Sequence, residues 1–333
     1  MIKNVENRKI SMNHRREEVQ MITVKTYRGH IRNWKELCAE LEIDPALPRE
    51  EKEQEILVKA YQKWGGEMAD HIYGMFAFAL WDEEEKKLFC LRDQFGTKPF
   101  YYYQTEDGEL LYGTMIRDII GQPGFKKELN EEMLQIYMSL TYGAGEDTFF
   151  KGLKKLLPGR YLIWKDGKVE IHRYWTPKFQ PDENKSLEDW ADEIHSTLKS
   201  IMPEVKTEDE TVESFLSSGV DSSYVLAMSD AKMSDSCGYD EERFDESRLA
   251  KKTAELLGRE HSVCKITPQQ YLISYHMLCT IWNSRLEMHL RSYLPLPAMQ
   301  PQNTRRFAIP EKVRMNSSVV TICTAMQNVT VKI

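Results

Sequence analysis

The stretch that decides the fold of the second half of this chain is "FLSSGVDSSYVLA", from Phe215 to Ala227. The residues "VESF" at its start have the pattern of a short buried strand, and "YVLAM" begins a helix. The small residues between them therefore lie at the carboxyl end of a strand and the N-terminus of a helix, where free backbone N–H groups and the helix dipole favour an anion. The stretch predicts a loop that holds a pair of phosphates, formed by Ser217, Ser218, Gly219, Val220, Asp221, Ser222 and Ser223.

Asp221 is the one carboxylate in this loop. A carboxylate close to phosphates is favourable when a Mg²⁺ ion bridges them, so we expect Asp221 to act on the metal indirectly. The loop has no Gly-Lys-Ser/Thr and is therefore not the phosphate loop of kinases and GTPases. The alternative interpretation is a serine-rich turn that caps a helix and binds nothing.

The composition indicates an ordinary globular protein. The 333 residues suggest two domains, and a net charge of −7 argues against a nucleic-acid-binding protein. No apolar run approaches the ~20 residues of a membrane span, and the first residues do not resemble a signal peptide. Six cysteines without a CxxC spacing indicate reduced thiols, so we expect a cytoplasmic protein.

The two halves of the chain differ in their patterns. Up to about Pro177, two helical segments precede alternating aromatic strands joined by tight turns, which predicts an antiparallel sheet in an α+β domain. Residues 179–186 are polar and read as a linker. Strand and helix patterns then alternate, which predicts a parallel sheet in an α/β domain. The predicted helices are 33–43, 51–65, 187–202, 245–258 and 268–278. The predicted strands include 74–82, 87–93 and 261–267, with a hairpin turn at 165–167.

The loop resembles the SGGxDSS pyrophosphate loop of ATP pyrophosphatases, with Ser218 in place of the second glycine. Further motifs occur in the order found in glutamine-dependent asparagine synthetases: "GMFAFALWD", "LRDQFGTKPFYY", "LLPGRYLIW" with "RYW", and then the loop. The chain is therefore identified as similar to that family from about Arg8 to Asn283. Within the resemblance, Cys237, Gly238 and Tyr239 would approach the adenine of ATP.

The resemblance implies a fold and a reaction. Residues 1–178 would form an incomplete αββα sandwich of the N-terminal-nucleophile type, a class II glutamine amidotransferase domain. Residues 187–284 would form part of a doubly wound parallel-sheet ATP pyrophosphatase domain. The implied reaction converts ATP, aspartate and glutamine or ammonia into asparagine through β-aspartyl-AMP, with Mg²⁺. These small molecules would be its ligands, with no nucleic acid or membrane partner, and a homodimer is compatible with the family.

The first domain departs from the family at its reaction centre. Position 2 is Ile2, where the family has the cysteine nucleophile exposed by removal of the initiator methionine. In "RGHIRN", Arg28 and His30 replace residues of the family's NGEIYN motif, while Gly29 and Asn33 are kept. We therefore hypothesise that this chain does not hydrolyse glutamine. A remnant of the glutamine site would consist of Arg8, Gly29, Asn33 and Glu53.

The hydrophobic residues of the tail, residues 285–333, follow neither a helix nor a strand period. We expect this tail to be disordered or an out-of-frame reading of a synthetase gene. "IPEKVRMNSSVV" (Ile309–Val320) can be written in codons whose shifted frame reads SGEGADEFFGG, a phosphate-side motif of the family. A divergent C-terminal extension is the alternative. On the frame-shift hypothesis the chain is a synthetase truncated at both ends, with impaired or no activity.

Two other functions stay open at this point. One is a nucleotide-binding pseudoenzyme that retains the loop without catalysis. The other is a related ammonia-dependent ligase that adenylates a different carboxylate.

Overall fold

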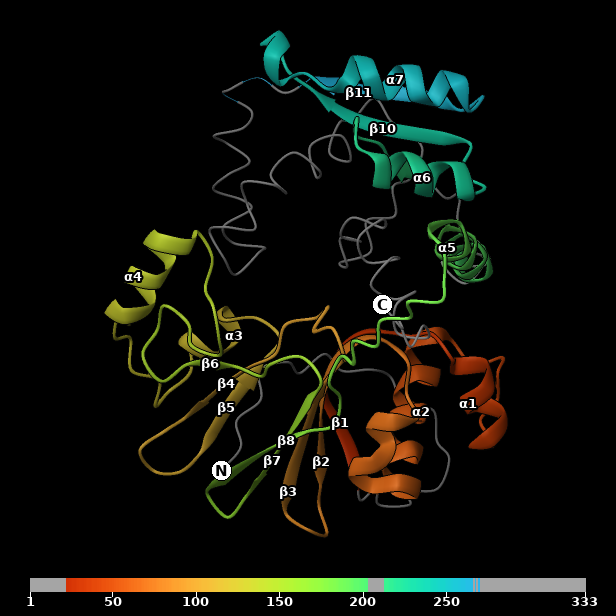
Figure 1. Ribbon diagram of the computed structural model, residues 1–333. Coiled ribbons are helices and arrows are strands. Elements are labelled where there is room, and N and C mark those ends of the chain that lie inside the picture. The colour runs from red at the N-terminus through yellow and green to blue at the C-terminus, as the bar shows by residue number, and fades with distance from the viewer. Residues whose placement is uncertain (1–21, 203–212, 266, 268, 270–333) are drawn as a thin grey trace. The chain divides into compact units, whose positions relative to one another are not determined.

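The computed structural model describes residues 22–202, 213–265, 267 and 269 (Figure 1). The chain divides into two compact units, which separate between Pro177 and Lys178. Ile2, Arg8, the tail 285–333 and most of the helix predicted after Thr267 lie outside the described residues. Within the described residues, no helix is both long enough and apolar enough to span a membrane.

The first unit contains two antiparallel sheets. The larger sheet has the strand order β1-β2-β3-β7-β8, and the smaller has the order β5-β4-β6. Local patterns alone predicted one antiparallel sheet, whereas the resemblance implied a sandwich of two sheets; the structure divides these strands between two sheets. The strands are β1 (Ile22–Ile31), β2 (Gly74–Asp82), β3 (Lys87–Arg92), β4 (Tyr101–Gln104), β5 (Leu110–Gly113), β6 (Lys154–Lys155), β7 (Arg160–Lys165) and β8 (Lys168–Arg173).

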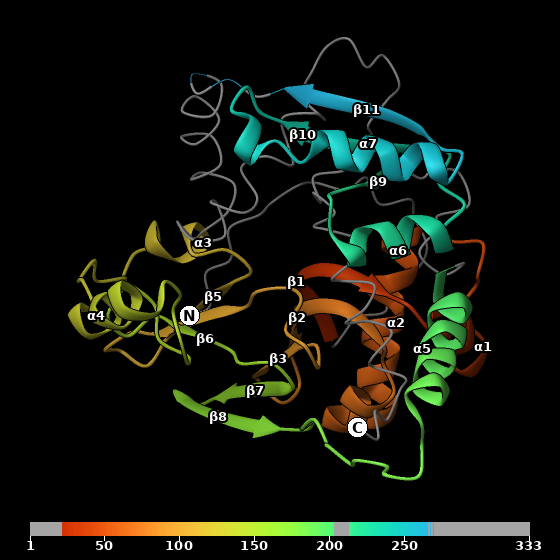
Figure 2. The same cartoon turned by 45° about the horizontal axis from the view of Figure 1, so that its top comes forward.

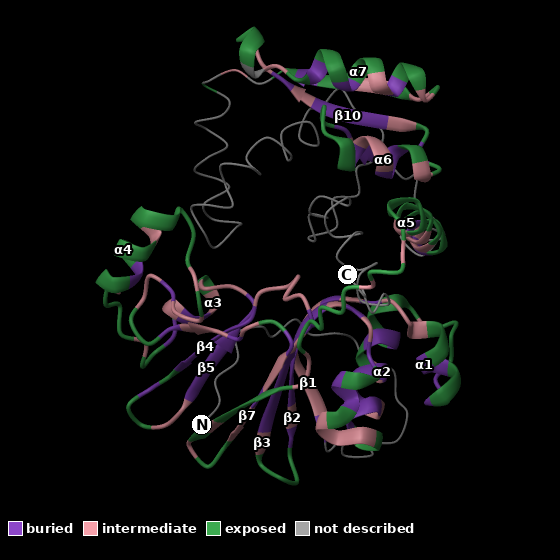
Figure 3. Ribbon diagram, in the orientation of Figure 1, coloured by how far each residue is buried: buried purple, intermediate pink, exposed green. Residues whose placement is uncertain are grey.

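Strand alternation explains how these sheets pack. On β2, Phe76 and Phe78 face a core shared with helix α2 (Arg49–Trp64), while Ala77 and Ala79 belong to a second core. That second core also contains Tyr102 and Tyr112 from the smaller sheet and Phe100, the residue just before β4. The two sheets therefore pack face to face. Figure 3 shows the buried residues concentrated on the strands and on one face of α2.

Shorter helices complete the layers. Helix α1 (Trp34–Glu40) joins α2 on the outer face of the larger sheet, and the 3₁₀ helix η1 (Gly65–Asp70) follows α2. On the other side of the smaller sheet, Tyr101 and Tyr103 pack with Ile119 of α3 (Arg117–Ile120). The layer order is therefore helix, sheet, sheet, helix. Helix α4 (Glu131–Leu140) begins at Asn130, whose side chain accepts a hydrogen bond from Met133 N.

A buried carboxylate fixes the turn after β3. Asp93 is fully buried and accepts hydrogen bonds from the backbone N–H groups of Phe76, Phe95, Thr97 and Lys98 and from the Thr97 hydroxyl. Burial raises the pKa of Asp93, and these donors oppose that rise. The bond from Phe76 N also ties this turn to β2, the strand that pairs with β3.

The second unit contains a parallel sheet, as the sequence predicted. Its strands are β9 (Glu213–Phe215), β10 (Met233–Gly238) and β11 (Glu260–Lys265), in the order β11-β10-β9 (Figure 2). Its helices are α5 (Leu187–Ile201), α6 (Val220–Met228) and α7 (Ser247–Leu256), and a short 3₁₀ helix η3 (Glu242–Phe244) precedes α7. Leu226 of α6 packs with Ala250 and Ala254 of α7 in one apolar cluster.

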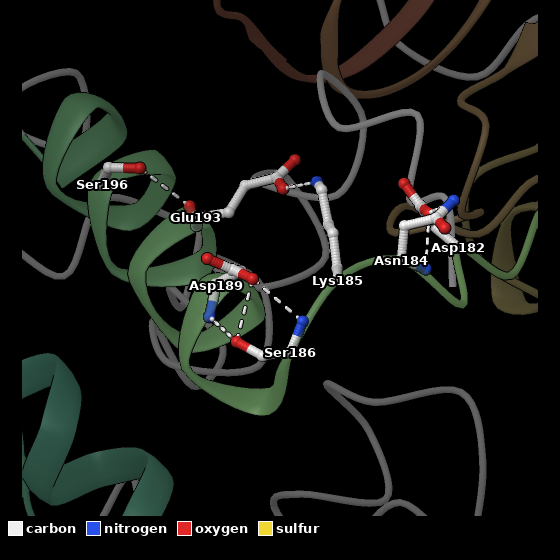
Figure 4. Close-up of polar contacts among 7 residues, drawn as sticks. All are labelled: Asp182, Asn184, Lys185, Ser186, Asp189, Glu193 and Ser196. Carbon is white, nitrogen blue, oxygen red and sulfur yellow. Dashed lines mark hydrogen bonds and ion pairs between the residues drawn. The ribbon is translucent and has the colours of Figure 1, made fainter.

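Helix α5 begins with a capping box, which Figure 4 shows in close-up. The Ser186 hydroxyl accepts a hydrogen bond from Asp189 N at 3.1 Å, and the Asp189 carboxylate accepts one from Ser186 N at 2.9 Å. Lys185 forms an ion pair with Glu193 and lies over the Trp190 ring. These contacts fix the direction in which the polar segment before α5 enters the helix.

Candidate functional site

The predicted phosphate loop lies at one edge of the parallel sheet. Phe215 of β9 pairs with Asp235 of β10, and Leu216 N donates to Asp235 O at 2.8 Å. Because the two strands are parallel, the segments that follow them leave the same edge of the sheet. The loop 216–219 after β9 and the segment 239–246 after β10 are therefore neighbours.

Two of the serine hydroxyls close the loop on itself. Ser217 Oγ and Ser222 Oγ lie 2.8 Å apart, and the Ser217 backbone N–H donates to Ser222 Oγ at 3.1 Å. Gly219 N donates to Ser217 Oγ at 3.1 Å, and the Ser223 hydroxyl donates to Gly219 O at 2.8 Å. The role of these hydroxyls as phosphate donors stays a prediction; in the structure they bond to other groups of the loop and hold its shape.

Ser218 makes a different contact. Its hydroxyl donates to Glu246 Oε2 at 2.8 Å, and its backbone N–H points to the same oxygen at 3.4 Å. Glu246 is the residue immediately before α7, and both side chains are exposed. Glu246 was not predicted as a site residue, because the several acidic residues around it are typical of a solvent-exposed segment.

Val220 and Asp221 form the first turn of α6 and are exposed, Val220 to 83%. Asp221 thus supplies one accessible carboxylate at the N-terminus of the helix. In the part of the chain that the structure describes, no group of three or more His, Cys, Asp and Glu side chains is arranged to hold a metal ion. The indirect role of Asp221 on a Mg²⁺ ion therefore stays a prediction.

The residues predicted near the adenine lie at the same sheet edge. Cys237 and Gly238 end β10, and Tyr239 follows. A Cβ atom at Gly238 would lie 2.9 Å from Val263 Cγ1, so this position is tightly packed. Burial raises the pKa of Cys237 to about 12, which keeps its thiol protonated and unsuited to nucleophilic chemistry. The approach of these residues to adenine stays a prediction.

A second polar cluster, in the first unit, is centred on Glu53. This side chain is 2% exposed and lies on α2. Glu53 Oε1 accepts hydrogen bonds from Ile31 N at 3.2 Å and Arg49 Nε at 3.2 Å, and lies 2.7 Å from His30 Nδ1. Glu53 Oε2 accepts one from the Tyr27 hydroxyl at 2.7 Å. Both carboxylate oxygens are therefore bonded to groups of this chain.

The electrostatics of the Glu53 cluster favour an ionised carboxylate. Burial opposes ionisation, but the hydrogen bond and charge of His30, with Arg49 and Tyr27, outweigh it and lower the pKa of Glu53. Burial, followed by the charge of Glu53, raises the pKa of Tyr27 and keeps its phenol protonated. The cluster is thus an anion surrounded by donors.

The other remnant-site residues shape the backbone nearby. Gly29 of β1 has a φ of +151°, and a Cβ atom there would lie 2.1 Å from Met75 O on β2. Asn33 donates to His71 O at 2.9 Å and accepts from Tyr73 N at 2.9 Å, which ties the end of β1 to the segment before β2. The structure places Gly29 and Asn33 on either side of Ile31, whose N–H bonds to Glu53.

Tyr27 and Arg49 were not predicted as members of the Glu53 cluster. Arg49 lies four residues before Glu53 on the same helix, so its i,i+4 spacing was a usable signal. Tyr27 contacts Glu53 from another element, and no local pattern indicates that contact.

Comparisons with known proteins agree with the motif order. Residues 11–175 match the family model of a glutamine amidotransferase domain, and residues 193–294 match that of asparagine synthase. Asparagine synthetase [glutamine-hydrolyzing] 1 of Bacillus subtilis is 30% identical over 254 residues, covering 74% of this chain and 39% of that protein. Asparagine synthetase [glutamine-hydrolyzing] 3 of the same organism is 31% identical over 206 residues, covering 61% and 33%.

A protein with a different name is also similar. Amidase chyE of Penicillium rubens is 26% identical over 294 residues, covering 80% of this chain and 41% of that protein. The chain spans less than half the length of each of these three relatives. By its two domain matches in this order and by its curated relatives, the chain belongs to the asparagine synthetase family.

Proposed function

We propose that the second unit binds ATP through residues 217–223 and transfers AMP to the side-chain carboxylate of aspartate, with release of pyrophosphate. Ammonia then attacks the activated carboxyl carbon and displaces AMP, which gives asparagine. The observation that carries this proposal is the position of the loop, between a parallel strand and the N-terminus of α6, inside the segment that matches the asparagine synthase model. The first N–H groups of a helix have no partner within the helix and attract phosphate.

The chemistry asks mainly for positioning and for neutralisation of charge. The N–H groups at the start of α6 would hold the departing pyrophosphate, and Ser217 and Ser222 keep the loop folded around that position. A Mg²⁺ ion bound with ATP would supply further charge neutralisation, with Asp221 as the nearby carboxylate.

For the first unit we propose an N-terminal-nucleophile-type sandwich that no longer uses glutamine. Its helix, sheet, sheet, helix layers support the fold. The closed Glu53 cluster supports the loss of glutamine binding, because its carboxylate oxygens are already bonded to Tyr27, Ile31 and Arg49. The α-ammonium group of glutamine could bind the Glu53 carboxylate only by displacing these donors from it.

The test is release of pyrophosphate from Mg-ATP by the full chain, with aspartate and ammonium chloride present or omitted. We expect release that depends on aspartate and that falls at least tenfold in Ser222→Ala. Ser229→Ala, at the other end of α6, is the matched control and should retain activity. Binding of ATP without any release would instead favour a nucleotide-binding pseudoenzyme.

Glutamine supplied in place of ammonium tests the first unit separately. We expect no glutamate above background. Glutamate formation would overturn the proposal for the first unit and leave that for the second unit intact.

A second candidate is a ligase for another carboxylate. A relative whose name does not mention asparagine, Amidase chyE of Penicillium rubens, is the reason to test other acceptors. The same pyrophosphate assay with other amino-acid carboxylates in place of aspartate distinguishes the two substrates.

A further inference from the structure

The contact between Ser218 and Glu246 occupies donors of the proposed phosphate loop. Ser218 is the position where this chain has a side chain and the loop it resembles has a glycine. The hydroxyl that this serine adds donates to Glu246 Oε2 at 2.8 Å, and the Ser218 N–H points to the same oxygen at 3.4 Å. A single carboxylate oxygen thus contacts both donors of Ser218.

A carboxylate resembles a phosphate in its charge and in its oxygen acceptors. Hydrogen bonds to an ionised acceptor are the stronger kind. Glu246 also lies immediately before α7, where the dipole of that helix stabilises a negative charge. The contact is therefore favourable without a ligand, yet both residues are exposed, so water can replace it at small cost.

We propose that Glu246 is an internal competitor for the phosphate loop: its carboxylate holds Ser218 when no ligand is bound and must leave before a phosphate can use these donors. The inference rests on the proposed function, since it concerns regulation of the same loop. It predicts that this chain binds phosphates more weakly than the loop alone would allow. Removing the carboxylate should then strengthen binding.

The experiment is calorimetric titration of the full chain with inorganic pyrophosphate, repeated with Mg-ATP. We expect Glu246→Ala to bind pyrophosphate about three- to tenfold more tightly than the unsubstituted chain. Glu242→Ala is the matched control, because Glu242 lies in the same segment and pairs with Arg248 at 3.6 Å. It removes an equal charge without touching the loop and should change affinity less than twofold.

A double-mutant cycle identifies the contact. In a Ser218→Gly background the hydroxyl bond is already absent, so Glu246→Ala should strengthen binding by a smaller factor than it does in the unsubstituted chain. Exchange of the Ser218 amide hydrogen, followed by NMR without ligand, should be faster in Glu246→Ala and unchanged in Glu242→Ala.

The outcomes separate the two proposals. If the unsubstituted chain binds pyrophosphate and Glu246→Ala binds equally or more weakly, the competitor role is wrong and the proposed function stands. If no variant binds pyrophosphate or Mg-ATP, the proposed function fails and the inference fails with it.

Discussion

Two glutamates organise polar clusters in this chain, and they do so in opposite ways. Glu53 in the first unit is 2% exposed and is bonded to groups of β1 and α2. Glu246 in the second unit is exposed and contacts the donors of one residue, Ser218. A buried carboxylate with several partners is costly to release, whereas an exposed contact exchanges readily with water. The first arrangement stabilises the fold, and the second occupies donors that become available once the exposed carboxylate of Glu246 moves away.

The largest effect is expected at Glu53. Glu53→Ala should lower the free energy of unfolding by about 3–5 kcal/mol, because it leaves two donors of β1, the Ile31 N–H and the Tyr27 hydroxyl, without their acceptor in a buried site. Urea unfolding measures this change. Glu55→Ala is the control on the same helix, where Glu55 is 39% exposed and pairs with Lys59, and it should cost less than about 1 kcal/mol. Equal losses in the two variants would show that Glu53 does not stabilise the unit as proposed.

The second prediction concerns pH. The pKa of Glu53 is lowered in the folded chain, so its contribution to stability is present above the unfolded value of about 4.3 and is lost as pH falls through the folded pKa. Burial raises the pKa of Asp93, which acts in the opposite direction, so the chain is compared with Glu53→Gln. The difference between their unfolding free energies should be constant near pH 7 and shrink below about pH 4. A constant difference down to pH 3 would contradict the assignment.

A third prediction tests an exposed contact that is local in sequence. Ser186→Ala should lower the free energy of unfolding by about 1 kcal/mol, because the capping box of α5 loses its hydroxyl (Figure 4). Thermal unfolding of the full chain measures it. Ser196→Ala within the same helix removes a hydroxyl that bonds to Glu193 O, and it should be neutral or slightly stabilising.

The smallest effect on stability is expected at Glu246. Glu246→Ala should change the free energy of unfolding by less than about 0.5 kcal/mol, because its contact is exposed. Urea unfolding without ligand is again the measurement. A loss above about 2 kcal/mol would place Glu246 in the same structural class as Glu53 and remove the contrast between them.

Much of the fold followed from local patterns. Gly74–Asp82 was predicted as a strand and forms β2 with the same bounds, because its alternating side chains belong to two cores. Ile22–Ile31 gave no strand prediction, because Lys25 and Arg28 interrupt its apolar pattern and most of its residues are half-buried. Pairing with β2 along nearly its whole length stabilises this segment as a strand, although its local pattern does not indicate one.

The site was predictable only where its residues are close in sequence. The segment from Ser217 to Ser223 is continuous, and Ser217–Gly219 lie between β9 and α6 as predicted, whereas Val220–Ser223 form the first turn of α6, four residues before the predicted start of the helix. The Ser218–Glu246 contact joins residues 28 positions apart through the register of two parallel strands. Tyr27 of β1 reaches Glu53 of helix α2 across 26 positions, through the packing of that helix on the sheet. Such contacts depend on tertiary packing, which a single sequence does not display.

The hairpin of β7 and β8 has a consequence for self-association. Its two-residue turn, at Asp166 and Gly167 with φ of 51° and 73°, leaves β8 at the margin of the larger sheet in the described structure. An open strand margin invites a neighbouring molecule to add its own strand. Here the exposed residues of β8 include Lys168, Glu170 and Arg173, whose charges would have to be desolvated in such a pairing. The charged residues on this edge strand therefore disfavour the addition of strands from other molecules, and with it aggregation.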